Sequence, residues 1–318
     1  MLLSSLTFLF ISLVNLSRSA SVNPDTLATF ERIAGYAGAA YCSSNHVTGV
    51  NGPTIFPPNI YDSNGATTIA YSFLKVDERK TTGLIMLDHA HKALVITFRG
   101  TISDADWETN LEFVLEDASD VCGKGCKAHA GFFASWRGVS DIVTTKWRAL
   151  SQQYPQYSTI ITGHSLGGAI AHLCAAGLKT VGPNAAMSLY SYASPRVGNE
   201  VFASFINQRF GANIYRFTHL DDPIPRLPGR LLGFVHTSPE YFITSPHIRK
   251  VLSAGKKTLA KPENVVVQAG DIHVLAGPEN EAGNVGYQTQ GQKPTIFDTL
   301  ADLFTLLFTA LPEQEDPS

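Results

Sequence analysis

The run Thr159-Ile160-Ile161-Thr162-Gly163-His164-Ser165-Leu166-Gly167-Gly168-Ala169-Ile170 decides the fold of this chain. A β-branched apolar segment ends at a glycine, and a segment of small residues that favours a helix follows at once. Between them stands Gly-x-Ser-x-Gly, which is typical of a strand, a sharp turn that carries the serine, and a helix. The residues on either side of such a turn approach closely, so Gly163 and Gly167 must lack side chains. We therefore predict that Ser165 is a nucleophile, with the first N–H groups of the next helix directed at charge developing beside it.

A bare Gly-x-Ser-x-Gly match also occurs by chance as an ordinary glycine-rich turn, and this is the alternative interpretation. The flanking residues decide between the two. Residues 159–162 are rich in β-branched side chains and residues 169–178 favour a helix, so both elements required around a nucleophilic serine are predicted.

The composition sets the class of protein. The 318 residues are 44% hydrophobic and 16% charged, with a net charge of −3, which suits one large α/β domain with a sizeable core. A protein that binds nucleic acid usually presents a basic face, so this near-neutral balance argues against a nucleic-acid partner. The chain shows no internal repeat and no interior linker.

Residues 1–20 have the pattern of a secretory signal peptide. An apolar run over 2–16 is followed by the small residues Ser17, Ser19, Ala20 and Ser21, which offer a cleavage site. The run is shorter than the ~20 residues that span a bilayer, so we expect cleavage rather than a transmembrane anchor. We expect residues 21–318 to form a single secreted domain.

Secretion makes the four cysteines candidates for disulfides. Cys122-Gly-Lys-Gly-Cys126 closes a tight loop, and we favour a disulfide there over a metal site with His129, because the chain offers no second pair of ligands. Whether Cys42 and Cys174 pair with each other stays open. Cys174 falls on the helix after the serine, where a buried free thiol is the simplest interpretation.

The remaining pattern alternates strands with helices. Apolar periodicity predicts helices over 24–41, 131–154 and 200–210, and strands over 68–76, 83–88, 93–98, 186–193, 213–218, 241–244 and 265–268. Such alternation predicts an α/β fold with a mostly parallel central sheet flanked by helices. Residues 103–115 read as a short amphipathic helix that Ser103 can cap.

The C-terminal stretch carries a wide apolar stripe at helical spacing, from Ile296 to Leu311. We favour a helix docked on the body of the protein over one that faces lipid or a partner. Asp298 and Asp302 within it argue against a membrane span. The segment 278–318 is otherwise an unassigned helical tail.

A serine hydroxyl needs a base to take its proton and a carboxylate to hold that base. In hydrolases with this turn, the order along the chain is Ser, then Asp or Glu, then His, each after a strand. For the acid we prefer Asp222 to Asp221, because Pro223 restricts Asp222 to an extended conformation. For the base, His273 follows the last predicted strand, and His247 remains a competitor.

Several motifs in order along the chain carry a resemblance, from about Tyr36 to His273. They are Phe98-Arg99-Gly100-Thr101, the stretch Gly163-His164-Ser165-Leu166-Gly167-Gly168-Ala169, Ser194-Pro195-Arg196-Val197-Gly198-Asn199, Asp222-Pro-Ile-Pro-Arg-Leu-Pro228, and Gly233-Phe234-Val235-His236 with Glu240-Tyr241. Together they resemble the class 3 triacylglycerol lipases, a family of secreted fungal enzymes.

The resemblance implies an α/β-hydrolase fold with Ser165, Asp222 and His273 as the catalytic triad. It implies an oxyanion hole formed by Thr101 and the N–H of Leu166. It also implies a hinged lid over 102–110 that includes Ile102 and Trp107, a structural role for His236, and a disulfide between Cys122 and Cys126. No metal or cofactor is implied. The chain departs from the family after His273, where Val274-Leu275-Ala276-Gly277 replaces the usual early aromatic residue.

Three functions fit these observations. The first is a lipase that hydrolyses acylglycerols at a lipid–water interface, which the apolar face with Trp107 favours. The second is an esterase for soluble esters of the feruloyl type, which would suit a more polar flap; Gly168 favours the lipase, since relatives acting on feruloyl esters tend to carry alanine there. The third is a non-catalytic protein of the same fold that binds lipid or a partner, which has no need of a strained serine.

Overall fold

The computed structural model describes residues 20–42, 45–46, 52–53, 66–76, 78–101, 113–244 and 269–277. Its strands are β1 (Ala20–Ser21), β2 (Gly52–Pro53), β3 (Thr67–Val76), β4 (Thr81–Asp88), β5 (Ala93–Phe98), β6 (Leu115–Asp117), β7 (Lys127–His129), β8 (Ser158–His164), β9 (Met187–Tyr192), β10 (Ile214–His219), β11 (Glu240–Ile243) and β12 (Ile272–Leu275). Its helices are α1 (Pro24–Ala39), α3 (Ser119–Cys122), α4 (Ala130–Gln153), α5 (Leu166–Val181) and α6 (Glu200–Phe210), with short 3₁₀ turns η2 (Ile224–Arg226), η3 (Arg230–Leu232) and η4 (Ala269–Asp271).

Ten of these strands form one sheet in the order β1-β12-β11-β10-β9-β8-β5-β4-β3-β2. Its centre, from β5 through β8, β9 and β10 to β11, is parallel, and antiparallel strands extend it at both sides. β6 and β7 pair separately as a small antiparallel ribbon. The predicted α/β architecture with a parallel sheet centre is confirmed.

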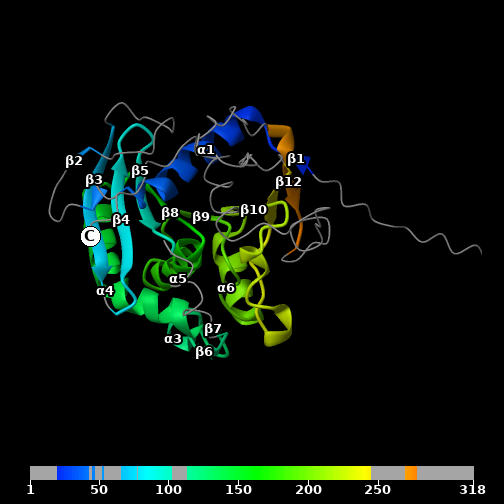
Figure 1. Cartoon of the computed structure of the whole chain (residues 1–318). Coiled ribbons are helices and arrows are strands. Elements are labelled where there is room, and N and C mark those ends of the chain that lie inside the picture. Colours follow the sequence, from blue (N-terminus) through cyan, green and yellow to red (C-terminus); the bar gives the residue numbers. More distant parts are fainter. Residues whose placement is uncertain are drawn as a thin grey trace, which may run out of the picture.

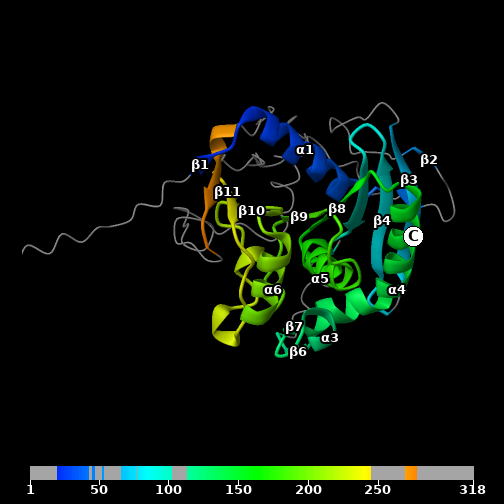
Figure 2. The same cartoon turned by 180° about the vertical axis from the view of Figure 1, so that it is seen from behind.

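Helices cover both faces of the sheet and bury a core on each. α4, α5 and α6 pack on one face, where Trp136 of α4 and Leu173 of α5 share a core with Phe98 of β5. α1 packs on the other face and contributes Phe30 and Ile33 to a second core. Figures 1 and 2 show α1 on one side of the sheet and α4, α5 and α6 on the other. The parallel strands are therefore buried on both sides, as a parallel sheet requires.

The helix starts follow from local chemistry. Asn23 caps α1 by accepting the N–H of Thr26 at 2.8 Å, and Pro24 occupies its first position. His129 caps α4, because its Nδ1 accepts the N–H groups of Gly131 and Phe132 at 3.1 and 3.4 Å. The helices predicted over 24–41, 131–154 and 200–210 are confirmed to within a few residues.

The structure shows the state of all four cysteines. Cys122 and Cys126 form the expected disulfide, with their Cα atoms 5.8 Å apart. Cys42 and Cys174 are both buried and free, so they do not pair with each other. Among the described residues, no helix is both long and apolar enough to cross a bilayer.

Candidate active site

The strand–turn–helix predicted around Ser165 is present in the structure. Ser165 stands between β8 and α5 with φ 55° and ψ −127°, a conformation that L-residues rarely adopt. A Cβ on Gly163 would lie 2.3 Å from the carbonyl oxygen of Gly167, and a Cβ on Gly167 would lie 2.1 Å from that of Phe98. Only glycine fits at either position, so this local sequence forces the serine onto the turn.

The segments that carry the predicted oxyanion donors, Leu166 and Thr101, lie beside Ser165. Leu166 opens α5, so its N–H is one of the first N–H groups of the helix, which have no partner within it. Gly100 follows the end of the neighbouring β5, and a Cβ on it would lie 3.2 Å from the Cβ of Ser165, which places this connection against the serine. Thr101 follows, and its buried Oγ1 has no hydrogen-bond partner among the described residues. A buried hydroxyl of this kind is suited to a ligand oxygen.

Tyr41 joins these two segments, and the sequence did not indicate it. Its hydroxyl accepts the N–H of Gly100 at 3.0 Å and lies 2.9 Å from Nδ1 of His164. Complete burial lowers the pKa of His164 to about 3, so its imidazole is neutral, and burial raises the pKa of Tyr41. The hydroxyl oxygen therefore accepts from the backbone and shares a second hydrogen bond with a neutral imidazole.

Asp222 lies in the turn after β10 and is completely buried. Its Oδ1 accepts the N–H of Ile224 at 2.9 Å, and its own N–H donates to the carbonyl of His219. β10 is the second strand along the sheet from β8, which corresponds to about 10 Å. This spacing leaves room for one imidazole between Asp222 and Ser165.

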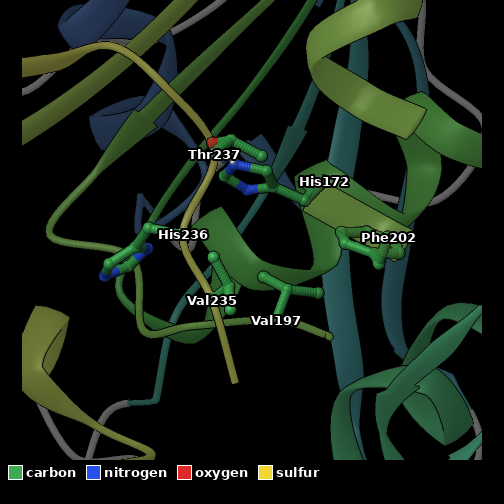
Figure 3. A pocket seen from close by; sticks show the side chains of 6 residues that line it. All are labelled: His172, Val197, Phe202, Val235, His236 and Thr237. Carbon is green, nitrogen blue, oxygen red and sulfur yellow. Dashed lines mark hydrogen bonds between the residues drawn. The ribbon is translucent and has the colours of Figure 1, made fainter. Parts of the chain in front are cut away.

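Two buried histidines support the segments on which Ser165 and Asp222 lie. His172, on α5, donates from Nδ1 to the carbonyl of Gly168 at 2.8 Å, and its Nε2 lies 3.1 Å from the hydroxyl of Thr237. Burial lowers the pKa of His172 to about 4, which fits an Nε2 that accepts. His236 donates from Nε2 to the carbonyl of Pro225 at 2.7 Å, in the loop after Asp222. Figure 3 shows His172 directed at Thr237, with His236 turned away from both.

The same loop is held from a second side by Arg196. Its N–H donates to the carbonyl of Leu227 at 2.7 Å, and its guanidinium donates to those of Arg226 and Pro228. His236 and Arg196 lie in the motifs quoted above, but no local sequence pattern indicates that both donate hydrogen bonds to backbone carbonyls of residues 225–228. The structural role predicted for His236 is in keeping with its contacts.

His273 stands within a strand, where the sequence analysis expected a loop. The sequence placed it in a loop after a final strand at 265–268, residues that lie outside the described part of the chain, whereas it stands inside β12 and pairs with Phe242. β12 is the second strand along the sheet from β10, the strand that leads to Asp222, and the fourth from β8.

Other predicted features lie outside the described residues. These are the lid with Ile102 and Trp107, the competing base His247, most of the signal peptide and the tail over 278–318. Ala20 and Ser21, which flank the predicted cleavage site, form β1 beside β12. Within the described residues, no group of three or more His, Cys, Asp or Glu side chains is arranged to hold a metal ion.

Comparison with known proteins identifies relatives of this chain. Residues 95–232 match the family model of Lipase (class 3). The chain is 35% identical to the secreted mono- and diacylglycerol lipase A of Penicillium cyclopium over 288 residues, which cover 89% of this chain and 87% of that protein. It is also 35% identical to the secreted mono- and diacylglycerol lipase 1 of Fusarium solani, over 80% of this chain and 75% of that protein.

Solved structures agree with the sequence relatives. The crystal structure of the mono- and diacylglycerol lipase from Aspergillus oryzae superposes with a TM-score of 0.67 and 36% identity, over 81% of this chain and 88% of that one. The α/β-hydrolase-type fold predicted from the sequence is thereby confirmed.

Proposed function

Since this chain belongs to the class 3 lipase family and is an ester-hydrolysing enzyme, we propose that it is a secreted lipase that hydrolyses acylglycerols through an acyl-enzyme on Ser165. The relatives from Penicillium and Fusarium are named as secreted mono- and diacylglycerol lipases, which supports both the substrate class and the location. The disulfide between Cys122 and Cys126 suits an oxidising compartment.

The proposed reaction begins with attack by Ser165 on the ester carbonyl while a histidine takes its proton. The tetrahedral oxyanion that forms accepts hydrogen bonds from the N–H of Leu166 and from Thr101, where one preorganised donor is typically worth about 3 kcal/mol. The histidine then protonates the leaving alcohol, the carbonyl re-forms, and water removes the acyl group by the same steps. Asp222 fixes the tautomer of the histidine and stabilises its charged form.

For the base, we propose a histidine that follows Asp222 along the chain. His273 satisfies this order and stands in β12, beside β11. His247, the competitor weighed from the sequence, follows β11 and lies outside the described residues. The two alternatives make opposite predictions for single substitutions, which are given in the Discussion.

We further propose that Ile102 and Trp107 belong to a lid that gates access to Ser165. Ser165 is only 3% exposed, so an ester must displace something to reach it. The test is the rate of hydrolysis measured as a short-chain ester passes its solubility limit. A jump in rate when droplets form supports the lid, whereas a smooth saturation curve supports a soluble-ester esterase of the same fold.

The observation that carries this proposal is the positive φ of Ser165 beside the buried hydroxyl of Thr101. The Ser165→Ala variant should lose ester hydrolysis by several orders of magnitude and keep the thermal unfolding temperature of the parent within a few degrees. Ser204→Ala, which removes an exposed hydroxyl on α6, is the matched control and should retain activity. Substantial turnover by the Ser165 variant would exclude this serine as the nucleophile.

A further inference from the structure

Three large apolar side chains stand out from the surface near one end of the molecule. Leu231 is fully exposed, and Leu232 and Val114 are exposed by 51% and 55%. Leu231 and Leu232 form η3, in the connection between β10 and β11, and Val114 immediately precedes β6. Exposed apolar residues that occur singly are ordinary, but neighbouring ones indicate a surface that another apolar phase covers.

These residues belong to one region of the fold. A Cβ on Gly233, next to Leu232, would lie 3.4 Å from the side chain of Leu115, next to Val114. The ring of His129 lies between those of Phe113 and Phe234, at centroid distances of 6.4 and 5.9 Å. Figures 1 and 2 both show the connection after β10 close to the β6–β7 ribbon. We call Val114, Leu231 and Leu232 the apolar rim.

The exposure of the rim is built into the structure. Phe234 is completely buried directly after η3, and Val235 forms a bridge with Gly198, which in turn bridges to Ala128 of β7. Before η3, Arg196 holds the carbonyl of Pro228 at 2.8 Å. The backbone on both sides of Leu231 and Leu232 is therefore anchored, and the two leucines are presented outward by a fixed loop.

Both segments that form the rim continue along the chain into residues predicted to belong to the candidate site. Leu231 and Leu232 share their connection with Asp222, and Val114 follows the predicted lid segment along the chain. Arg230, beside the two leucines, is also exposed. Hydrolysis of an acylglycerol releases a fatty acid, whose carboxylate remains in the lipid surface and makes it negative. A cationic group beside apolar side chains complements such a surface.

We propose that the apolar rim with Arg230 docks the enzyme on the surface of acylglycerol droplets that contain fatty acid, with Leu231 and Leu232 inserted among the acyl chains. This inference rests on the proposed function, because that function makes an acylglycerol surface the substrate phase. It identifies a fixed attachment surface made of residues outside the predicted lid.

The test measures adsorption with hydrolysis switched off. Ser165→Ala protein is mixed with trioleoylglycerol droplets, with or without added oleic acid, at a mildly alkaline pH, and the unbound protein is measured after flotation. In this background, Leu231→Ser with Leu232→Ser should weaken adsorption to both kinds of droplet by about tenfold or more, because the two leucines no longer bury apolar surface among the acyl chains. Arg230→Gln should weaken adsorption only to the droplets that contain oleic acid.

The matched controls are Leu74→Ser on β3 and Val181→Ser at the end of α5, which are exposed by 45% and 42% but lie outside the rim. Both should adsorb like the parent. Equal adsorption by the double leucine variant and the parent would overturn the docking surface. Adsorption of the Arg230 variant equal to that of the parent on the droplets that contain oleic acid would show that Arg230 takes no part in docking. Because every protein here lacks Ser165, these outcomes do not depend on which residues catalyse hydrolysis.

Discussion

The hydroxyl of Tyr41 lies 2.9 Å from Nδ1 of His164, the residue that immediately precedes Ser165. The same oxygen accepts the N–H of Gly100 at 3.0 Å, so one side chain ties the turn with the serine to the strand end that leads to Thr101. Ser165, the proposed nucleophile, follows β8, whereas Thr101, one of the proposed oxyanion donors, follows β5, and this contact ties the two strand ends together. Accurate placement of such donors is what makes them effective in catalysis.

Replacement of Tyr41 by phenylalanine should therefore reduce kcat more than it raises KM. The variant keeps the ring but leaves the N–H of Gly100 and Nδ1 of His164 without the hydroxyl, at a cost of about 1–3 kcal/mol in the free energy of unfolding. Tyr157→Phe, which removes a surface hydroxyl bound to His89, is the control and should behave like the parent. Unchanged kcat in the Tyr41 variant would show that the hydroxyl serves stability alone.

Alanine at Gly163 or Gly167 should abolish activity and lower the unfolding temperature sharply. The new methyl group would lie within 2.3 Å of a backbone carbonyl in either case, and backbone cannot move aside without opening the turn at Ser165. Gly229→Ala is the matched control, because its Cβ would meet open space and its φ is −63°. Thermal melts and ester hydrolysis by the three variants check this prediction. A fully active Gly167 variant would contradict the packing of α5 against β5.

The two candidates for the base are separated by His273→Ala and His247→Ala. If His273 is the base, its alanine variant should lose hydrolysis by orders of magnitude while His247→Ala retains it. The reverse result would assign the base to His247. Labelling of Ser165 by an organophosphate provides a second measurement, because an inactive base variant should also react slowly.

The protein should lose stability as the pH falls from about 6.5 towards 4. Burial lowers the pKa of His129 and His172 to about 4 and that of His164 to about 3, from an ordinary 6.5. In this window the unfolded chain binds protons that the folded one does not, so the stabilisation is complete above pH 6.5 and is lost below it. Unfolding temperatures measured from pH 8 to 4 test the direction. His172→Gln should flatten the slope, and a flat profile in the parent would contradict it.

The part of the site that depends on neighbouring residues could be predicted from sequence. The turn at Ser165 follows from Gly163 and Gly167, and the helix over 200–210 follows from Asn199, whose side chain caps it by accepting the N–H of Phe202. Such features arise within a few residues of one another. Their periodicity and capping are therefore visible in the chain itself.

The parts that depend on distant pairing were missed or misplaced. Tyr41 and His164 are separated by 123 positions, so no local pattern reveals their contact. β12 has only four residues and exists by pairing with β11 and with Ala20–Ser21, two residues that the sequence placed at the cleavage site. Strand formation at a sheet edge is decided by the partner strand, which the sequence of β12 does not contain.

The two free cysteines can report the order in which the two layers of helices detach during unfolding. Cys174 lies in α5 on one face of the sheet, and Cys42 follows α1, the helix that covers the other. Because both thiols are buried, an alkylating reagent reaches each only when the layer above it detaches. The order in which the two become modified, read by mass spectrometry, would report which layer leaves first and whether the layers come away together.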